Sequence, residues 1–314
     1  MSPPGSTAQF RRLLFAGEAF VDLMMWVPSL PERGGDLVAS SSGVAVGGGF
    51  NVMAAAARQG LPVVYAGGHG IGPWGDLVRA ALASENIEIQ RPPDPRADTG
   101  FDVALVEPAG ERTFVTSLGA ESLPAPDGWP AGRPGDAVYV SGYGLAAPES
   151  GPALGAWAAA LPAGVSLFVD PGPLVAGIPA AVLGPVLARV DWWSSNQREA
   201  TLLTGAGDPA DAARQLRARM PQASVMVRAG AAGCVLATAE GQLTEIPAPA
   251  VDAVDTTGAG DAHAGVFLAA LAAGLPPAAA AARANAAAAL STTRTGPATA
   301  PGRAELDERI AGWL

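Results

Sequence analysis

The chain has 314 residues, of which 49% are hydrophobic and 15% are charged, and its formal net charge is −10. This composition is typical of a compact folded protein and excludes a disordered chain. Nucleic-acid and anionic membrane partners require clustered positive charge, so we expect small molecules as the partners of this acidic chain, with no nucleic acid and no membrane.

Two absences in the composition limit the chemistry. The 19 basic residues are all Arg, which excludes a P-loop lysine and a lysine Schiff base, so phosphate chemistry must rely on main-chain N–H groups, Arg and metal ions. Cys234 is the only cysteine, which excludes an intrachain disulfide and a cysteine-rich metal site and fits a cytoplasmic location. No apolar run is long enough to predict a membrane span.

Short apolar runs bounded by turn residues predict strands in the first half of the chain. We expect them at 13–16, 37–39, 44–46, 62–66, 101–106 and 112–117. Helices are expected from Asn51 to a stop at Gly60 and over 74–84. The strands at 37–39 and 44–46, and those at 101–106 and 112–117, form two hairpin-like segments that interrupt a βα pattern. We therefore expect these segments to pair outside the main sheet as a small lid.

The second half alternates more regularly. Strands are predicted at 137–141, 166–170, 192–195 and 225–229, a hairpin at 233–238 and 242–246, and helices at 260–273, 277–290 and 303–313. Strands separated by helices call for a parallel sheet covered on both faces. The sequence therefore predicts an α/β protein, and ligands of such sheets bind at the carboxyl ends of the strands.

The stretch 254–261, Val-Asp-Thr-Thr-Gly-Ala-Gly-Asp, runs into an apolar segment and predicts a glycine loop at the start of a helix. Unpaired N–H groups, the helix dipole and the small residues Gly258 and Gly260 make an anion site there, with Asp261 beside a bound phosphoryl group. Taken alone, the same residues equally fit an ordinary loop with an N-cap.

Several short motifs follow one another in an order that supports the anion site. They are Gly47-Gly48-Gly49-Phe50-Asn51 with Gly60 and Gly70, Asn196-Gln197-Arg198-Glu199, Gly230, and Asp255-Thr256-Thr257-Gly258-Ala259-Gly260-Asp261. Through them the chain resembles the PfkB carbohydrate kinases, the ribokinase-like group, over nearly its whole length. The resemblance implies a single domain over 1–314 with a three-layer α/β/α fold, a central mostly parallel sheet, and a β lid formed from about 23–46 and 98–118.

The resemblance also implies that ATP phosphorylates a hydroxyl of a sugar, a sugar acid or a nucleoside. Asp261 matches the catalytic base, and the N–H groups of Gly258, Ala259, Gly260 and Asp261 would hold the transferred phosphoryl group. This arrangement needs no lysine.

The nucleotide end of the site is implied by a second set of residues. Asn196 and Glu199 match the family's Asn-x-x-Glu motif, which contacts Mg²⁺ and phosphate through water. The structural alternative is that Asn196 caps a helix and Glu199 lies in its first turn. Arg228, Gly230 and Gly233 lie where the nucleotide strand ends, and a surface ion pair is the alternative role for Arg228.

Asp22, Asn51, Gly47 and Gly48 match the positions that bind the sugar. Ribokinases carry Lys where this chain has Gly48 and Asn where it has Phe20, which argues against ribose itself. Arg112, on the predicted lid hairpin, suits an anionic substrate group if it points inward and is otherwise a solvated or structural residue.

A monovalent cation, K⁺, is implied more weakly. The loops that would hold it, mostly through carbonyl groups, correspond to Asp255, Thr257, Ser291, Arg294 and Gly296.

We therefore expect an ATP-dependent, Mg²⁺-requiring carbohydrate kinase. A nucleoside kinase of the same fold and a non-catalytic ligand sensor are the alternatives. Exposed apolar lid strands favour a homodimer. A dinucleotide-dependent oxidoreductase would need a Gly-x-Gly-x-x-Gly turn after the first strand, where this chain has Gly17-Glu18-Ala19-Phe20.

Overall fold

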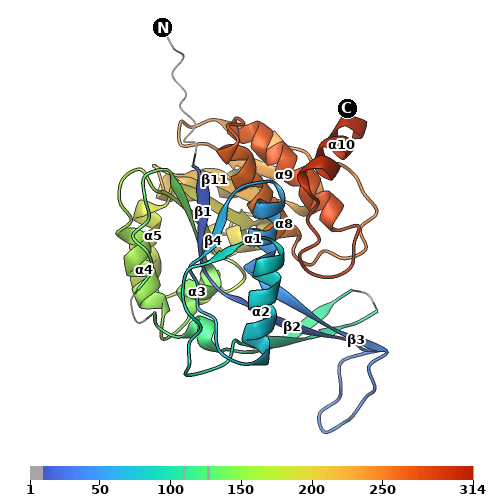
Figure 1. Ribbon diagram of the computed structural model, residues 1–314. Coiled ribbons are helices and arrows are strands. Elements are labelled where there is room, and N and C mark those ends of the chain that lie inside the picture. Colours follow the sequence, from blue (N-terminus) through green and yellow to red (C-terminus); the bar gives the residue numbers. More distant parts are fainter. Residues whose placement is uncertain (1–9, 109, 126–127, 314) are drawn as a thin grey trace.

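The computed structural model describes residues 10–108, 110–125 and 128–313. Within them, nine strands form the main sheet in the order β13-β12-β11-β10-β9-β8-β1-β4-β5 (Figure 1). All neighbours are parallel except in the antiparallel pairs β11/β12 and β12/β13. The strands are β1 (Arg12–Ala16), β4 (Val63–Tyr65), β5 (Glu88–Ile89), β8 (Asp136–Ser141), β9 (Ser166–Asp170), β10 (Trp192–Asn196), β11 (Ser224–Arg228), β12 (Cys234–Ala237) and β13 (Leu243–Ile246).

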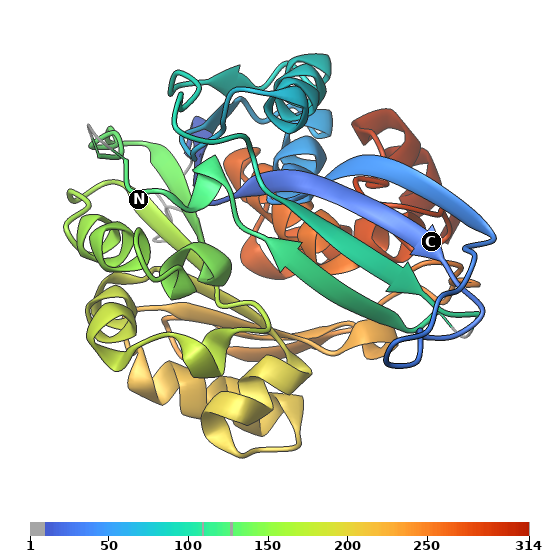
Figure 2. The ribbon, with the colours of Figure 1, turned by 90° about the horizontal axis from the view of Figure 1, so that it is seen from below.

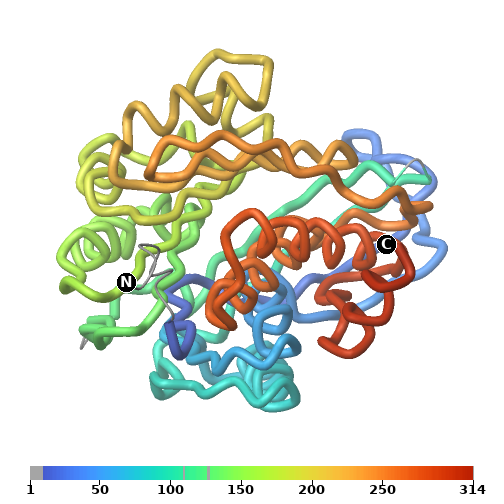
Figure 3. The backbone as a smooth tube through the Cα atoms, turned by 90° about the horizontal axis from the view of Figure 1, so that it is seen from above, coloured from blue at the N-terminus to red at the C-terminus, as the bar shows by residue number. Residues whose placement is uncertain are grey.

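Helices cover both faces of the main sheet, because its strands are apolar on both sides. On β1, Leu13 and Phe15 pack into one cluster and Leu14 and Ala16 into the other. The first cluster is covered by α1 (Phe50–Arg58), α2 (Pro73–Ser84), α8 (Ala259–Ala272) and α9 (Pro277–Ser291), and α10 (Arg303–Trp313) packs on α9. The second is covered by α3 (Gly142–Ala146), α4 (Gly151–Ala159), α5 (Ala180–Arg189), α6 (Gln197–Thr204) and α7 (Pro209–Arg219). Figure 3 shows the resulting three layers, which confirm the predicted α/β/α class.

Short 3₁₀ helices complete the connections. They are η1 (Ala120–Ser122), η2 (Val175–Gly177) and η3 (Gly230–Ala232). No helix in the described ranges has the length and apolar character needed to cross a membrane.

Four further strands form a separate small sheet in the order β3-β2-β6-β7, which projects from the body (Figures 1 and 2). These strands are β2 (Ala19–Trp26), β3 (Ser41–Gly48), β6 (Phe101–Val106) and β7 (Arg112–Ser117). β2 runs parallel to β6, and the other two pairs are antiparallel. The predicted hairpin of 101–106 and 112–117 is present with its predicted bounds, and Ala109 in its turn lies outside the described residues.

Two expectations about this small sheet were wrong. Residues 37–39 form no strand: Val38 is 88% exposed, and no neighbouring strand supplies the hydrogen bonds that a strand needs. The sheet also begins earlier than residue 23, since β2 starts at Ala19 and pairs along its whole length with β3 as far as Gly48. Asp22 therefore lies within the small sheet, and not on a loop beyond the end of β1.

Candidate active site

Asp261 lies in the first turn of α8, next to the start of α1. The side-chain Nδ2 of Asn51, in the first turn of α1, donates to Oδ2 of Asp261 at 3.0 Å. Oδ1 of Asn51 accepts the main-chain N–H of Ala298 at 2.9 Å. Because that N–H can only donate, it fixes the orientation of the Asn51 amide and directs the NH₂ group at Asp261.

The surroundings of Asp261 raise the pKa of its carboxyl group. Burial raises the pKa of Asp261 to about 6, against the Asn51 hydrogen bond, and the nearby Asp170 adds to the rise while Arg228 opposes it. A carboxylate with this pKa is ionised at pH 7 and has an appreciable affinity for a proton, which are the two requirements of a general base.

The loop before α8 presents main-chain N–H groups beside this carboxylate. Gly258 has a φ of +70°, a left-handed conformation that favours glycine, and it caps α8. In the described ranges, the N–H groups of Gly260 and Asp261 have no acceptor, whereas that of Ala259 donates to the carbonyl of Thr256 at 3.2 Å. Of the four groups expected to form the anion site, at least these two are free to bind a phosphoryl group, and that of Ala259 is engaged.

Polar side chains from the last residues of β9, β10 and β11 lie beside the same loop. The guanidinium of Arg228 donates to Asp170 Oδ2 at 2.6 Å and to Ser194 Oγ at 2.8 Å, and it lies 3.9 Å from Glu199. A Cβ added to Gly260 would lie 3.6 Å from Cζ of Arg228. Arg228 thus reaches the anion loop, but as part of an ion-pair network and not as a free cation.

Asn196 and Glu199 form the capping box that was the alternative to a ligand role. Asn196 Oδ1 accepts the N–H of Glu199 at 2.8 Å, and Glu199 Oε2 accepts the N–H of Asn196 at 2.8 Å. The Asn196 amide also donates to Glu199 Oε1 at 2.7 Å. Each carboxylate oxygen of Glu199 therefore already accepts one hydrogen bond within the cap. Burial and Asp170 raise the pKa of Glu199.

The two glycines expected at the nucleotide end have different environments. Gly230 has a φ of +58° and open space around its Cα. A Cβ on Gly233 would lie 2.1 Å from the carbonyl oxygen of Ile246, so this glycine allows the close packing of the β12/β13 hairpin.

Three of the expected sugar-binding residues, Asp22, Gly47 and Gly48, lie close together on the β2/β3 pair of the small sheet. On the β2/β3 pair Asp22 is opposite Ala45 and diagonal to Gly47, and a Cβ on Gly47 would be 2.1 Å from Asp22 Oδ2. Gly48, with a φ of +59°, lies against the ring of Phe20. Burial, followed by the charges of Asp102 and Asp261, raises the pKa of Asp22 to about 7. Asp22 and Asp261 thus belong to one electrostatic cluster.

Two carboxylates of this cluster, Asp102 and Glu18, were not predicted from the sequence. Asp102 faces Asp22 from β6, and Glu18 lies between β1 and β2, where its Oε1 accepts from Ser141 Oγ at 2.7 Å. Asp102 interrupts an apolar strand, which is a recognisable signal, but Glu18 stands in a turn with no pattern that distinguishes it.

Arg112 is already paired with an acidic residue. It forms an ion pair with Asp255 that joins β7 to the loop before α8. Asp255 also accepts the N–H groups of Thr257 and Gly296, each at 2.8 Å. Burial opposes ionisation of Asp255, but the N–H groups of Gly296 and Thr257, together with Arg112, outweigh it and lower its pKa. This ion pair corresponds to the structural role that was the alternative considered from the sequence.

The remaining residues expected around a monovalent cation are only partly assembled. Asp255, Thr257 and Gly296 are linked by the bonds above, and the carbonyl of Ser291 accepts from Thr299 Oγ1 at 3.0 Å. The side chain of Arg294 pairs with Glu305 on α10.

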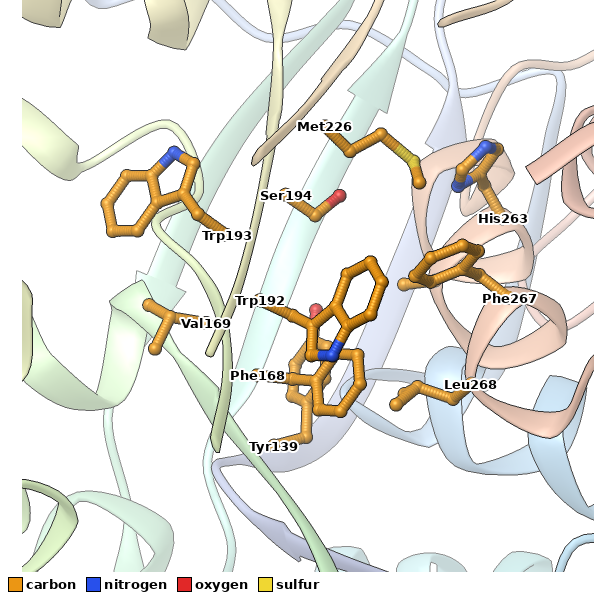
Figure 4. Close-up of a pocket in the computed structure, with 11 residues that line it drawn as sticks. Tyr139, Phe168, Val169, Trp192, Trp193, Ser194, Met226, His263, Phe267 and Leu268 are labelled. Atoms are coloured by element: carbon orange, nitrogen blue, oxygen red, sulfur yellow. The ribbon is translucent and has the colours of Figure 1, made fainter. Parts of the chain in front are cut away.

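Aromatic rings pack between α8 and the main sheet. Figure 4 shows His263 and Phe267 of α8 facing residues of β9, β10 and β11 across a small cavity. Trp192 stacks on Phe168 with ring centroids 5.6 Å apart and meets Phe267 edge-on at 5.2 Å. Burial, followed by the charge of Arg228, lowers the pKa of His263 to about 3, so this ring is neutral at pH 7.

Comparisons with known proteins agree with this arrangement. The model of the pfkB family carbohydrate kinases matches residues 11–302. The chain is 34% identical to the uncharacterized sugar kinase YegV of Escherichia coli (strain K12), covering 94% of this chain and 92% of that protein, and 32% identical to a fructokinase of Klebsiella pneumoniae, covering 83% and 84%. The aminoimidazole riboside kinase of Salmonella enterica, solved with aminoimidazole riboside and an ATP analog, superposes with a TM-score of 0.76 at 25% identity, covering 96% of this chain and 100% of that one.

A three-layer α/β/α arrangement with a small sheet at its side is the ribokinase-like fold. The chain belongs to the pfkB family of carbohydrate kinases.

Proposed function

We propose that the protein transfers the γ-phosphoryl group of ATP to a hydroxyl of a small carbohydrate, with Asp261 as the general base. The observation that carries this proposal is the position of one ionisable carboxylate, oriented by Asn51, beside the unpaired N–H groups of Gly260 and Asp261. A base and an anion site on the same turn are what transfer to an alcohol requires.

In the proposed reaction, the substrate hydroxyl gives its proton to a carboxylate oxygen of Asp261 as its oxygen forms a bond to the γ-phosphorus. The bond from that phosphorus to the β–γ bridging oxygen breaks, and ADP leaves with the electron pair. The N–H groups of the α8 start hold the oxygens of the phosphoryl group during transfer. Asn51 stabilises the ionised form of Asp261 before the proton arrives.

Mg²⁺ and the nucleotide would lie at the ends of β9 to β11. The described residues contain no group of three or more His, Cys, Asp or Glu side chains suited to a metal ion, which fits a Mg²⁺ that enters with ATP and neutralises phosphate charge. Glu199 and Asn196 would contact its water shell. Arg228 and Gly230 would border the phosphates, while Gly233 supports the hairpin.

Two further parts of the proposal concern K⁺ and the assembly of the protein. The loops of residues 255–257 and 291–296 are joined through Asp255 and suit a site made of carbonyl groups, to which Arg294 would contribute only its main chain. Exposed apolar residues on the small sheet, including Phe114, Val115 and Val44, support a homodimer through this sheet. We expect light scattering to give the mass of a dimer.

A substrate screen tests the function. Purified protein with MgATP is incubated with sugars, sugar acids and nucleosides, and ADP release is followed by a coupled assay. We expect saturable turnover with a carbohydrate. The similarity to aminoimidazole riboside kinase supports a nucleoside kinase as the second candidate, and preferential turnover of nucleosides would favour it. Nucleotide binding without turnover of any of these compounds would instead indicate a ligand sensor.

A further inference from the structure

Two carboxylates lie side by side on the small sheet. Asp22 of β2 and Asp102 of β6 are directly opposite in a parallel pair, so their side chains share one face. Asp102 is only 5% exposed, and its Oδ1 has no hydrogen-bond partner among the described residues. An unpaired buried acceptor is costly, so a site with this feature is complete only when a donor reaches it.

A third carboxylate adds to the same charge. Glu18 is 9% exposed, and although its Oε1 accepts from Ser141, its Oε2 has no partner in the described part of the chain. Burial raises the pKa values of Glu18, Asp22 and Asp102 to about 7, 7 and 6. The charge of Asp261 contributes to the rise for Glu18 and Asp22, and the charge of Asp102 contributes to the rise for Asp22.

Two arginines of the site region form ion pairs with other carboxylates. Arg112 pairs with Asp255, and Arg228 pairs with Asp170. Across the described ranges, the ion pairs join no arginine to Glu18, Asp22 or Asp102. A carboxylate or phosphate group on the substrate would therefore add negative charge beside three acids that take part in none of these ion pairs.

We infer that the sugar-binding end takes the part of a substrate that is rich in hydroxyl or amine donors and carries no carboxylate or phosphate, and that Asp102 sets this specificity together with Asp22. The inference rests on the proposed kinase function. It narrows the substrate class to neutral or amino sugars and removes sugar acids from it.

The physical reason is a match of donors to acceptors. Each hydroxyl or ammonium group of the substrate supplies a donor to an oxygen that lacks one, and it does so without adding negative charge. A site with buried groups that need a partner strongly rejects analogues that leave those groups unpaired. We therefore expect a neutral or amino sugar to be preferred over its sugar acid by about 100-fold or more.

Matched ligands test the inference. Two sets of ligands are compared: D-glucose, D-glucosamine and D-gluconate, and D-ribose and D-ribonate. For each ligand we measure kcat/KM with MgATP and, by calorimetry, the binding affinity without nucleotide. We expect the better neutral or amino sugar to exceed its acid by at least about 100-fold in kcat/KM. In Asp102→Asn this ratio should shrink to about 10-fold or less, while the KM for MgATP stays unchanged.

Asp76→Asn is the control, since it removes the same charge from a side chain that is 73% exposed on α2, and it should leave the ratio unchanged. A sugar acid that binds as tightly as the neutral sugar in the wild type would overturn the inference, even if Asp102→Asn does not fold. A ratio unaffected by Asp102→Asn would also overturn it, as would calorimetry that detects no sugar binding. Sugar binding with the expected selectivity but without ADP release would instead count against the kinase function.

Discussion

The hydrogen bond from Asn51 to Asp261 makes a quantitative prediction about pH. Replacing Asn51 by Leu keeps a side chain of similar size but removes the donor 3.0 Å from Asp261 Oδ2. A hydrogen bond to a charged group contributes about 1.5–3 kcal/mol, and one pKa unit corresponds to about 1.4 kcal/mol. Because the donor stabilises only the ionised form, the pKa of Asp261 should rise from about 6 by about 1–2 units.

The assay is the pH dependence of kcat/KM for the sugar, whose acid limb reports the base in the free enzyme. In the wild type, activity should fall as pH drops through about 6, since Asp261 then becomes protonated. In Asn51→Leu the midpoint should move to between about 7 and 8, so that at pH 6.5 the ionised fraction falls from about 75% to about 25% or less. A lower maximum kcat/KM with an unchanged midpoint would reflect only a lost substrate contact. An unshifted midpoint, or one moved to lower pH, would refute the reasoning.

Three further substitutions test other parts of the site. Gly47→Ala should raise the KM for the sugar at least about tenfold, because its Cβ would lie 2.1 Å from Asp22 Oδ2, whereas Gly43→Ala on the same strand, with its nearest contact at 3.6 Å, should not change this KM. Arg112→Ala should lower the free energy of unfolding in urea by about 3 kcal/mol, since it breaks a largely buried ion pair, and an unchanged unfolding midpoint would contradict that role. Burial raises the pKa of Glu18 to about 7, so its contribution to stability is present at pH 4 and is lost as pH rises through 7. Glu18→Gln should therefore be more stable than the wild type by about 2 kcal/mol at pH 8 and by nothing at pH 4, as measured by thermal unfolding, and equal stability at both pH values would count against this assignment.

Local patterns in the sequence were sufficient for most of the fold. The hairpin of β6 and β7 was predicted because alternating apolar residues flank a turn, and both halves of that signal lie within 17 residues. The strand at residues 37–39 was wrong for a complementary reason. Its residues suit a strand, but whether a strand forms depends on a partner, which no local pattern reveals.

Contacts between distant segments account for what the sequence did not show. Arg112 and Asp255 are 143 residues apart, and their pairing depends on how the small sheet sits against the loop before α8. Asp102 is a single acidic residue in a strand, and only its register with Asp22 shows that two carboxylates share one face. The family motifs, in contrast, predict Asn51 and Asp261 in one site, and a hydrogen bond joins these two side chains in the structure.

The most direct test of the central claim is the turnover of Asp261→Asn with the best substrate of the wild type. The Asn side chain has nearly the same shape and can still occupy the first turn of α8, but it cannot accept the hydroxyl proton. We predict that kcat falls by about 10²–10⁴-fold while the dissociation constant for MgATP changes by less than about threefold. Turnover close to that of the wild type would contradict the assignment of Asp261 as the base.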